Sequence, residues 1–194
     1  MLTVNIHSVE PVVFDFLGSL PVKVEFVEEQ LSSDGGLLPL REFDDRLGWT
    51  AGFAGQIRDG RQGHTHAIAE MVRQRVFGIL AGYEDQNDHD TLRSDGIFKL
   101  VAGRQPDDRD LASQPTLSRL ENAVAASDLL RLEEWFLEQF IRSFAEPPAQ
   151  LTLDIDVFDD PTHGQQQLTF FHGFYEQYQY LARVITCAEN DLVV

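Results

Sequence analysis

Two consecutive prolines, Pro147 and Pro148, constrain the fold of this chain more than any other feature. Proline has no backbone N–H and its ring fixes φ, so a pair of prolines can continue neither a helix nor an interior strand. The segments before the pair have apolar residues at helical spacing, whereas those after it alternate as strands do. The sequence therefore predicts an α+β protein, with a mainly helical part before the prolines and strands after them.

The helical part is preceded by one short strand, because residues 22–29 alternate apolar and polar side chains. After a turn at 32–36, apolar residues recur at intervals of three and four, and Gly48 is expected to cap the first helix. Another run, which begins near Ser127, has the widest apolar stripe and predicts the central packing helix. The other expected helices lie near residues 38–47, 67–83, 97–101 and 117–124.

Three strands are expected after the prolines, at 151–158, 167–175 and 179–187. A three-stranded meander without a covering helix is marginally stable alone, so we expect the unit at 149–194 to be incomplete. The predicted organisation is an N-terminal extension at 1–21, a helical domain at 22–146 and the opening strands of a second domain at 149–194.

The charge balance does not suggest a nucleic-acid-binding protein. The chain has 15 Lys and Arg against 32 Asp and Glu, a net charge of -17. Such a surface repels phosphate on average. An enzyme that acts through bound metal ions nevertheless needs carboxylates at its metal site. No apolar run approaches the roughly 20 residues that cross a bilayer, so the expected location is cytoplasmic, without a membrane partner.

Two acidic residues, Asp154 and Asp156, form the main candidate site. On a strand they share one face, while Leu153, Ile155 and Val157 share the other. Two neighbouring carboxylates on a strand built for burial repel each other and lose hydration, and a divalent cation would relieve both costs. The alternative is a solvent-exposed sheet edge, on which the two aspartates only maintain solubility.

Several longer blocks occur in order along the chain. They are Ser32 to Gly36, Gly82 to Asp90, Ala112 to Asn122, Leu153 to Asp156, Asp159 to Gln166, Phe170 to Tyr175 and Tyr178 to Leu181. Together these blocks strongly resemble the start of the catalytic domain in group 1 DDE transposases of bacterial insertion sequences. Two places depart from the family pattern. Phe158 stands where relatives usually have Thr or Ser, and Ala182-Arg183 stands where the pattern favours Pro and an apolar residue.

The resemblance implies an RNase H-like catalytic domain in which three acidic residues hold two Mg²⁺ ions, preceded by a helical domain associated with DNA binding. Asp156 corresponds to the first acidic residue of that triad, and Asp154 is the less favoured metal ligand. In relatives the second Asp and the final Glu lie beyond Val194, so we expect the chain to be inactive by itself. Expected partners are the element's terminal repeats, target DNA and, in the complete protein, a second copy, with association to the nucleoid.

Phosphate contacts are predicted for five arginines, which are Arg73, Arg75, Arg93, Arg104 and Arg119. His163, in the turn after the acidic strand, could contact DNA, and a role in anchoring that loop is an equal alternative. Ordinary salt bridges with the abundant acids are an equal alternative for the arginines. The aromatic residues of 170–180 could stack on bases, but their alternation favours a sheet core.

Two other functions stay open. The chain could be a non-catalytic DNA-binding or dimerising remnant of a decayed transposase, or an unrelated acidic metal-binding module.

Overall fold

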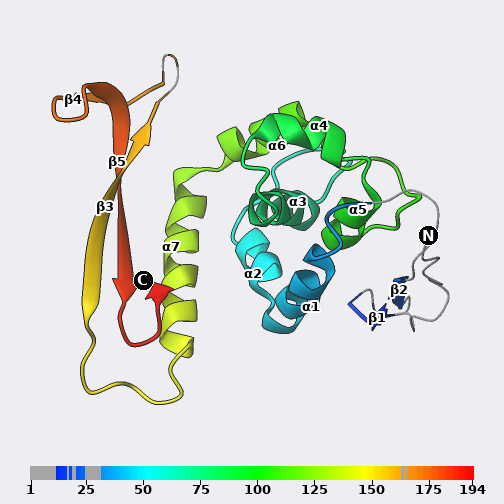
Figure 1. Ribbon diagram of the computed structural model, residues 1–194, viewed down its shortest axis with the longest axis horizontal. Helices are drawn as coiled ribbons and strands as arrows, with labels where there is room; N and C mark the ends of the chain where they lie inside the picture. The colour runs from blue at the N-terminus through cyan, green and yellow to red at the C-terminus, as the bar shows by residue number, and fades with distance from the viewer. Residues whose placement is uncertain (1–11, 17, 19–20, 25–31, 163, 165) are drawn as a thin grey trace, which may run out of the picture. The chain divides into compact units, whose positions relative to one another are not determined.

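The computed structural model describes residues 12–16, 18, 21–24, 32–162, 164 and 166–194. The chain separates into two compact units, one that extends to Leu132 and one that comprises Glu133–Val194 (Figure 1). Both helices and sheets are present, so the predicted α+β class is confirmed. The boundary between the units lies inside a helix rather than at Pro147-Pro148, and the domain limits expected from the sequence stay predictions.

The first unit is mainly helical. The expected helices are confirmed, and Gly48 ends α1 with φ at +71°, its N–H donating to the Asp44 carbonyl oxygen at 2.7 Å. The Asp95 carboxylate caps α5 by accepting from the N–H groups of Ile97 and Phe98. The elements are β1 (Val12–Phe14), β2 (Val22–Val24), α1 (Leu37–Leu47), α2 (Trp49–Gly55), α3 (Ile68–Leu80), the 3₁₀ helix η2 (Gln86–Asp88), α4 (His89–Leu92), α5 (Gly96–Ala102), α6 (Gln114–Ala123) and the start of α7 (Ala126–Arg142).

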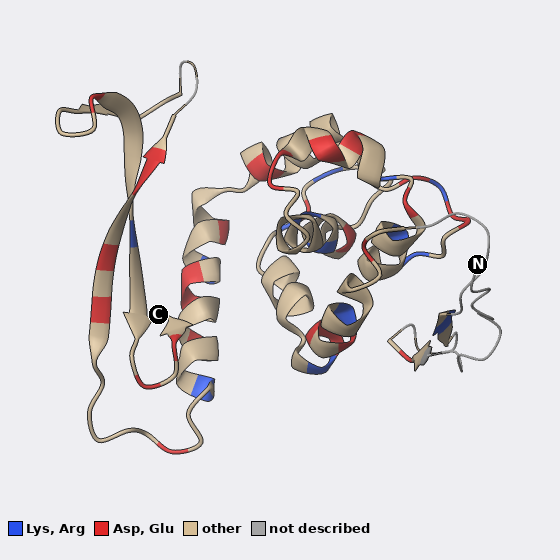
Figure 2. Ribbon diagram, viewed as in Figure 1, with Lys and Arg blue, Asp and Glu red and all other residues tan. Residues whose placement is uncertain are grey.

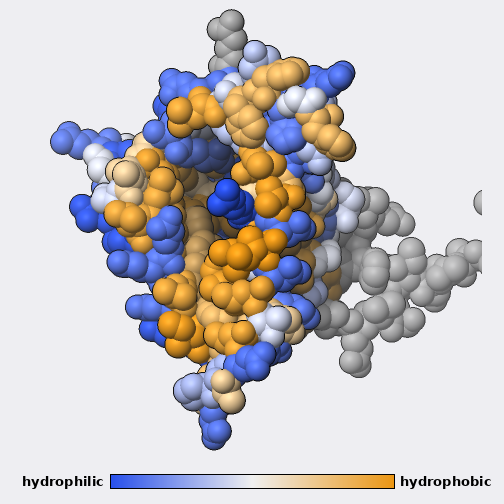
Figure 3. All heavy atoms as spheres, turned by 90° about the vertical axis from the view of Figure 1, so that its left-hand side faces the viewer, coloured by the Kyte–Doolittle hydropathy of each residue, from blue (hydrophilic) through white to orange (hydrophobic). Residues whose placement is uncertain are grey.

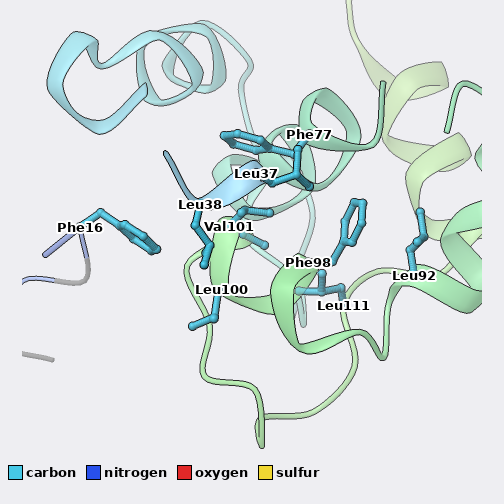
Figure 4. Packing of buried hydrophobic residues seen from close by; sticks show 10 residues of the cluster. Phe16, Leu37, Leu38, Phe77, Leu92, Phe98, Leu100, Val101 and Leu111 are labelled. Carbon is cyan, nitrogen blue, oxygen red and sulfur yellow. The ribbon is translucent and has the colours of Figure 1, made fainter. Parts of the chain in front are cut away.

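Two apolar clusters hold this unit together. The first gathers side chains of α1, α3, α4 and α5 around Phe77, Phe98 and Val101, all of which are buried (Figure 4). The second packs Met71 and Leu117 between α3 and α6. Burial of each large apolar side chain stabilises the fold by about 1.5–3 kcal/mol. These clusters fix the helices on which the candidate arginines lie.

The second unit is an antiparallel sheet with the last turns of α7. Its strands are β3 (Leu153–Pro161), β4 (Phe170–His172), β5 (Gln177–Cys187) and β6 (Leu192–Val193). β5 is central: β3 pairs along one side of it from Gln179 to Cys187, and β4 and β6 pair with its two ends on the other side. β3 is therefore an edge strand of the described sheet, and this position determines the exposure of the acidic pair.

The prediction that α7 is the central packing helix is wrong. Leu132 and Phe140 are buried, but Leu130 and Ile141 are each 60% exposed, and Leu129, Phe136 and Leu137 are exposed as well. The boundary between the two compact units falls within this helix, so no single core encloses its apolar stripe. In the described part of the chain, no helix is long and apolar enough to cross a membrane.

Candidate functional site

The acidic strand β3 has the predicted alternation of side chains. Asp156 lies opposite Val184 of β5, and Asp154 lies opposite Thr186, so both carboxylates project from the same face of the sheet. Asp160, opposite Tyr180, follows on this face four residues further along. The acidic residues mark β3 as red bands in Figure 2.

Every residue of β3 is exposed, in contrast to the prediction that the strand is built for burial. Ile155, on the face away from Asp156, is 62% exposed. In the described residues, neither face of β3 is covered by a packed layer, which explains why apolar alternation did not produce burial. The two carboxylates are hydrated, and the cost of burying like charges does not arise in this arrangement.

The carboxylate of Asp156 has one defined contact. Its Oδ1 accepts a hydrogen bond from the N–H of Val157 at 2.8 Å. This contact leaves Oδ2 free to accept another donor or to coordinate a cation, since a carboxylate has about four lone-pair sites. Neighbouring side chains on one face of a strand are roughly 6.6 Å apart at the backbone, so Asp154 and Asp156 can approach the same ion.

A complete metal centre is not formed by the described residues, among which no group of three His, Cys, Asp or Glu is placed to hold an ion. A paired-metal site needs a carboxylate that bridges the ions and further ligands from other elements. Asp154 and Asp156 have suitable oxygen donors for part of such a site.

The start of β3 is tied to the end of β5 through Glu189, which the sequence did not single out. The Glu189 carboxylate oxygens accept from the N–H of Thr152, each at 3.0 Å, and one of them also accepts from the Cys187 thiol at 3.0 Å. The hydrogen bond from Cys187, followed by those from Thr152, lowers the pKa of Glu189 to about 2. Burial, followed by the hydrogen bond to Glu189, raises the pKa of the Cys187 thiol.

Two of the predicted phosphate-binding arginines are engaged inside the helical unit. Arg73 Nε donates to Thr50 Oγ1 at 3.2 Å. Burial and the nearby cation of Arg41 lower the pKa of Arg73. Arg75 Nε lies 3.2 Å from Glu121 Oε1, and its Nη1 is buried. Arg75 therefore has the ion pair of the salt-bridge alternative, whereas Arg73 donates to a hydroxyl group.

The other predicted contacts lie elsewhere. Arg93 Nε is 3.4 Å from Asp110 Oδ2. Arg119 is exposed on α6 and its Nη2 donates to Thr116 Oγ1 at 3.1 Å. His163 falls outside the described residues. Arg73, Arg75, Arg93 and Arg119 have four different sets of partners, and these contacts do not bring them together as one cluster.

Two loops of the same unit, at 58–61 and 104–109, carry four arginines, of which the sequence predicted a phosphate contact only for Arg104. Arg104 forms an ion pair with Glu70 at 2.6 Å, and Arg109 donates to the carbonyl oxygen of Thr65. Arg61 forms an ion pair with Asp59, with Arg61 Nε 2.7 Å from Asp59 Oδ1. The signal that could have found these arginines is their clustering at 58–61 and 104–109, which the three aspartates of the same two ranges obscure.

The aromatic residues of the hairpin formed by β4 and β5 are exposed, so the prediction of a sheet core is wrong for them. Phe174 is 82% exposed and Tyr178 is 58% exposed. The predicted strand at 167–175 is also shorter, because a turn occupies residues 173–176. The described sheet has no second layer at this end to cover the rings.

Comparison with known proteins identifies one family. The family model for the transposase DDE domain group 1 matches residues 14–189, which is most of the chain. No curated protein and no solved structure matches the chain. DDE transposases act on DNA and use divalent metal ions, in agreement with carboxylates projecting from one face of β3. Because the match includes both the helical unit and the acidic strand, the chain belongs to the transposase DDE domain group 1 family.

Proposed function

We propose that the chain acts in DNA transposition by an insertion sequence, with Asp156 as the first carboxylate of a magnesium-dependent centre that cleaves and joins DNA strands. The observation that carries the proposal is the family match across β3, together with the exposed position of Asp156 beside Asp154 on one face. In this proposal the substrates are the terminal repeats of the element and its target DNA, and the assembled form is a homodimer.

The strand order supports an RNase H-like sheet as part of the proposal. β5 pairs antiparallel with β3 and with β6, as the opening strands of such a sheet would. The short strand β4 pairs with β5 instead of lying between β3 and β5, where the expected meander would place it. The outer edge of β3 is unpaired among the described strands. Unpaired N–H and C=O groups along such an edge can pair with another strand, although four of the nine residues of β3 are Asp. A strand added there, from residues outside those described, would bring further side chains next to Asp156.

The chain's own contribution to the chemistry is a positioned carboxylate. The Val157 N–H holds Oδ1 of Asp156, and antiparallel pairing with Val184 fixes the backbone beneath it. Asp154 adds negative charge two residues away, which favours a cation over an anion at this face. A divalent ion, when bound, polarises a phosphoryl oxygen and lowers the pKa of bound water. The further ligands of that ion are proposed to come from other residues.

The test of Asp156 is transposition of an element in cells that express the complete coding sequence, with Asp156→Asn compared with Asp160→Asn. Asparagine keeps the shape of the side chain but removes the charge that binds a cation. We expect Asp156→Asn to reduce strand cleavage by about 100-fold or more, a loss of roughly 2.7 kcal/mol in transition-state stabilisation. Asp160→Asn changes an acid on the same face and strand, and is expected to retain cleavage within a few-fold.

Near-normal cleavage by Asp156→Asn, in a protein with an unchanged circular dichroism spectrum, would refute the assignment. An equal loss in both variants would also refute it, because a general effect of negative charge on this strand would then explain the result.

A non-catalytic remnant that binds DNA is the second candidate. The observation that favours it is that the described residues contain no three-ligand metal group. The two candidates differ in one measurement. If the chain is a remnant, replacement of Asp156 leaves the frequency of transposition unchanged. Any effect of the remnant on a related element in the same cell then depends on DNA binding or dimerisation alone.

A further inference from the structure

One end of the sheet carries aromatic rings and a carboxylate on the same face. Residues opposite each other in an antiparallel pair share a face, and so do alternate residues along a strand. By this rule Asp160, which is opposite Tyr180, lies on the face of Tyr178 and of Phe171, its partner in β4. These residues and the ring that precedes Asp160 on this face define the acidic-aromatic patch: Phe158, Asp160, Phe171, Tyr178 and Tyr180.

The rings of the acidic-aromatic patch are open to solvent. Phe158 is 48% exposed, Phe171 is 54% exposed and Tyr178 is 58% exposed. Phe171 and Tyr178 form an edge-to-face pair, with ring centroids 5.5 Å apart and the rings inclined at 65°. Such a pair leaves ring faces uncovered. Figure 3, which looks onto the side of the molecule at the left of Figure 1, shows apolar residues in orange beside hydrophilic residues in blue. The patch therefore offers π-surfaces next to a carboxylate.

The charge around the patch selects a cationic occupant. Six Asp and Glu, but no Lys or Arg, occur between Arg142 and Arg183. Arg183 lies opposite Val157 and is therefore on the other face of the sheet. Asp159 Oδ2, which is 3.3 Å from Gln177 Nε2, adds negative charge beside the hairpin. Such a surface repels an anionic occupant and attracts a cation.

Among cations, the composition of the patch favours the guanidinium group of arginine. Mg²⁺ takes oxygen ligands, which aromatic rings do not supply. A guanidinium group stacks on a ring face while its N–H groups donate to a carboxylate. Phe158 and Asp160 are two residues apart on one strand, a spacing of roughly 6.6 Å. Alternate side chains of an extended polypeptide repeat at the same spacing, so arginines of such a segment can contact rings and carboxylate together.

We infer that the acidic-aromatic patch binds an extended, arginine-bearing segment of another protein. Arginine side chains of this segment stack on Phe171 and Tyr178 and donate to the carboxylate of Asp160. A second copy of the chain does not supply the segment, because Lys23 and Arg183 are the only Lys or Arg in the described strands. The inference goes beyond the proposed function, since this contact needs neither DNA nor a divalent ion.

The test uses the 194-residue chain and a fluorescein-labelled peptide of nine residues, the length of β3, in which Arg and Thr alternate. Fluorescence anisotropy is measured in EDTA, so divalent ions do not contribute. We expect the peptide to bind, with an affinity that falls as salt rises from about 50 to 200 mM because the attraction is screened. A peptide with Gln in place of Arg should not bind, and one with Lys should bind more weakly because an ammonium group lacks the planar face.

Two changes in the patch separate the rings from the charge. Phe171→Leu/Tyr178→Leu leaves the charge unchanged and is expected to weaken binding of the arginine peptide by about tenfold, since two cation–π contacts are lost. Asp160→Asn keeps the rings and is expected to weaken it by about threefold, as for one exposed ion pair. Circular dichroism checks that each variant keeps the fold.

Two further variants serve as controls. Glu133→Gln/Glu134→Gln removes two charges from exposed positions of α7, more than Asp160→Asn does, and is expected to bind the peptide as the unchanged chain does. Phe170→Leu removes a ring from the other face of β4, where Phe170 lies opposite Gln179, and is also expected to bind normally.

The inference is overturned if the arginine peptide binds no more tightly than the glutamine peptide, or if the variant without the two rings binds it normally. An equal loss in Asp160→Asn and in Glu133→Gln/Glu134→Gln also overturns it, because net charge would then explain the binding. Sedimentation velocity gives the last outcome. If the unchanged chain is a dimer that loss of the rings converts into a monomer, the patch is a contact between copies and the inference is wrong. The peptide measurement contains no DNA, so its result is independent of the cleavage test of Asp156→Asn.

Discussion

At the scale of single residues, polar groups inside the helical unit show why it has one arrangement. The buried Gln74 side chain donates to the Ala112 carbonyl oxygen at 2.8 Å and accepts from the Ala112 N–H at 3.1 Å. This pair of bonds joins α3 to the segment before α6. His89 is also fully buried, and burial lowers its pKa. The two bonds between the buried Gln74 amide and the Ala112 backbone favour one alignment of these segments. A shift of either segment by one residue would leave the amide N–H, the amide oxygen, the backbone N–H and the backbone carbonyl unpaired.

Replacement of Gly78 tests the packing of α3 against His89. A Cβ atom on Gly78 would lie 2.7 Å from Cε1 and 2.9 Å from Nε2 of His89, a ring with no room to retreat because it is buried. Gly78→Ala is therefore expected to destabilise the protein by about 1–3 kcal/mol, the usual cost of overpacking. Urea denaturation followed by circular dichroism measures the change.

Gly55→Ala is the matched control for this experiment. Gly55 is also helical, at the end of α2, but nothing lies within 4 Å of a Cβ built there. Alanine reduces the conformational freedom of the unfolded chain, so this variant should be stabilised by about 0.4–1 kcal/mol. Equal effects at the two positions would contradict the packing described around His89.

At the scale of elements, the sheet of the second unit depends on a link between its strand ends. β3 is exposed on both faces, so pairing with β5 and the Glu189 contacts to Thr152 and Cys187 are the main features that locate it. Hydrogen bonds to a carboxylate are stronger than those between neutral groups. The position of Asp156 in the site thus depends on a residue of the loop that follows β5.

Acid pH is expected to loosen the start of β3. The pKa of Glu189 is about 2 in the folded chain, below its ordinary value of 4.5. Between pH 2 and pH 4.5 the unfolded chain therefore binds more protons at Glu189 than the folded chain does. The stability that ionised Glu189 contributes is fully present above about pH 4.5 and is lost as the pH falls towards 2. Hydrogen exchange at Thr152 should lose protection over that range.

Glu189→Gln removes the ionisation while keeping an oxygen acceptor. The variant should show less protection at Thr152 at neutral pH and little further loss on acidification. Glu146→Gln, an exposed position in the loop before the prolines, should behave as the unchanged chain does. If Thr152 protection in the unchanged chain is constant from pH 6 to 2.5, Glu189 does not hold the strand.

At the scale of the whole molecule, net charge is the dominant feature. A charge of -17 on 194 residues gives long-range repulsion that opposes the compact state. The ion pairs of the helical unit, such as Arg104 with Glu70, offset part of this locally. Because the Debye length falls from about 30 Å at 0.01 M to about 8 Å at 0.15 M, salt screens the distant repulsion more than the short pairs.

Added salt is therefore expected to stabilise the chain. We expect the midpoint of thermal unfolding to rise by about 2–4 °C between 10 and 300 mM NaCl, equivalent to roughly 1 kcal/mol for a protein of this size. Differential scanning calorimetry measures the shift. Glu133→Gln/Glu134→Gln, which removes two exposed charges from α7, should raise the midpoint at low salt and reduce its dependence on salt. A midpoint that falls with salt would show that attractive pairs dominate.

The sequence by itself determined the local structure. The capping glycine at 48, the three- and four-residue spacing of α3 and the alternation of β3 are properties of neighbouring residues, so the helices and the shared face of Asp154 and Asp156 could be predicted. Family resemblance, carried by ordered blocks, also came from sequence alone. Burial could not be derived in this way, because it depends on which surfaces meet.

Only the tertiary structure decided that β3 is an exposed edge strand, that Phe174 and Tyr178 are exposed, and that α7 is not a central helix. It also assigned partners to the arginines and placed Glu189 beside Thr152, 37 residues away in sequence. Alternation predicts which side chains share a face of a strand. Whether that face is buried, and how much its burial stabilises the fold, depends on the layer that packs against it. Such contacts between distant segments leave no periodic signal in the residues that make them.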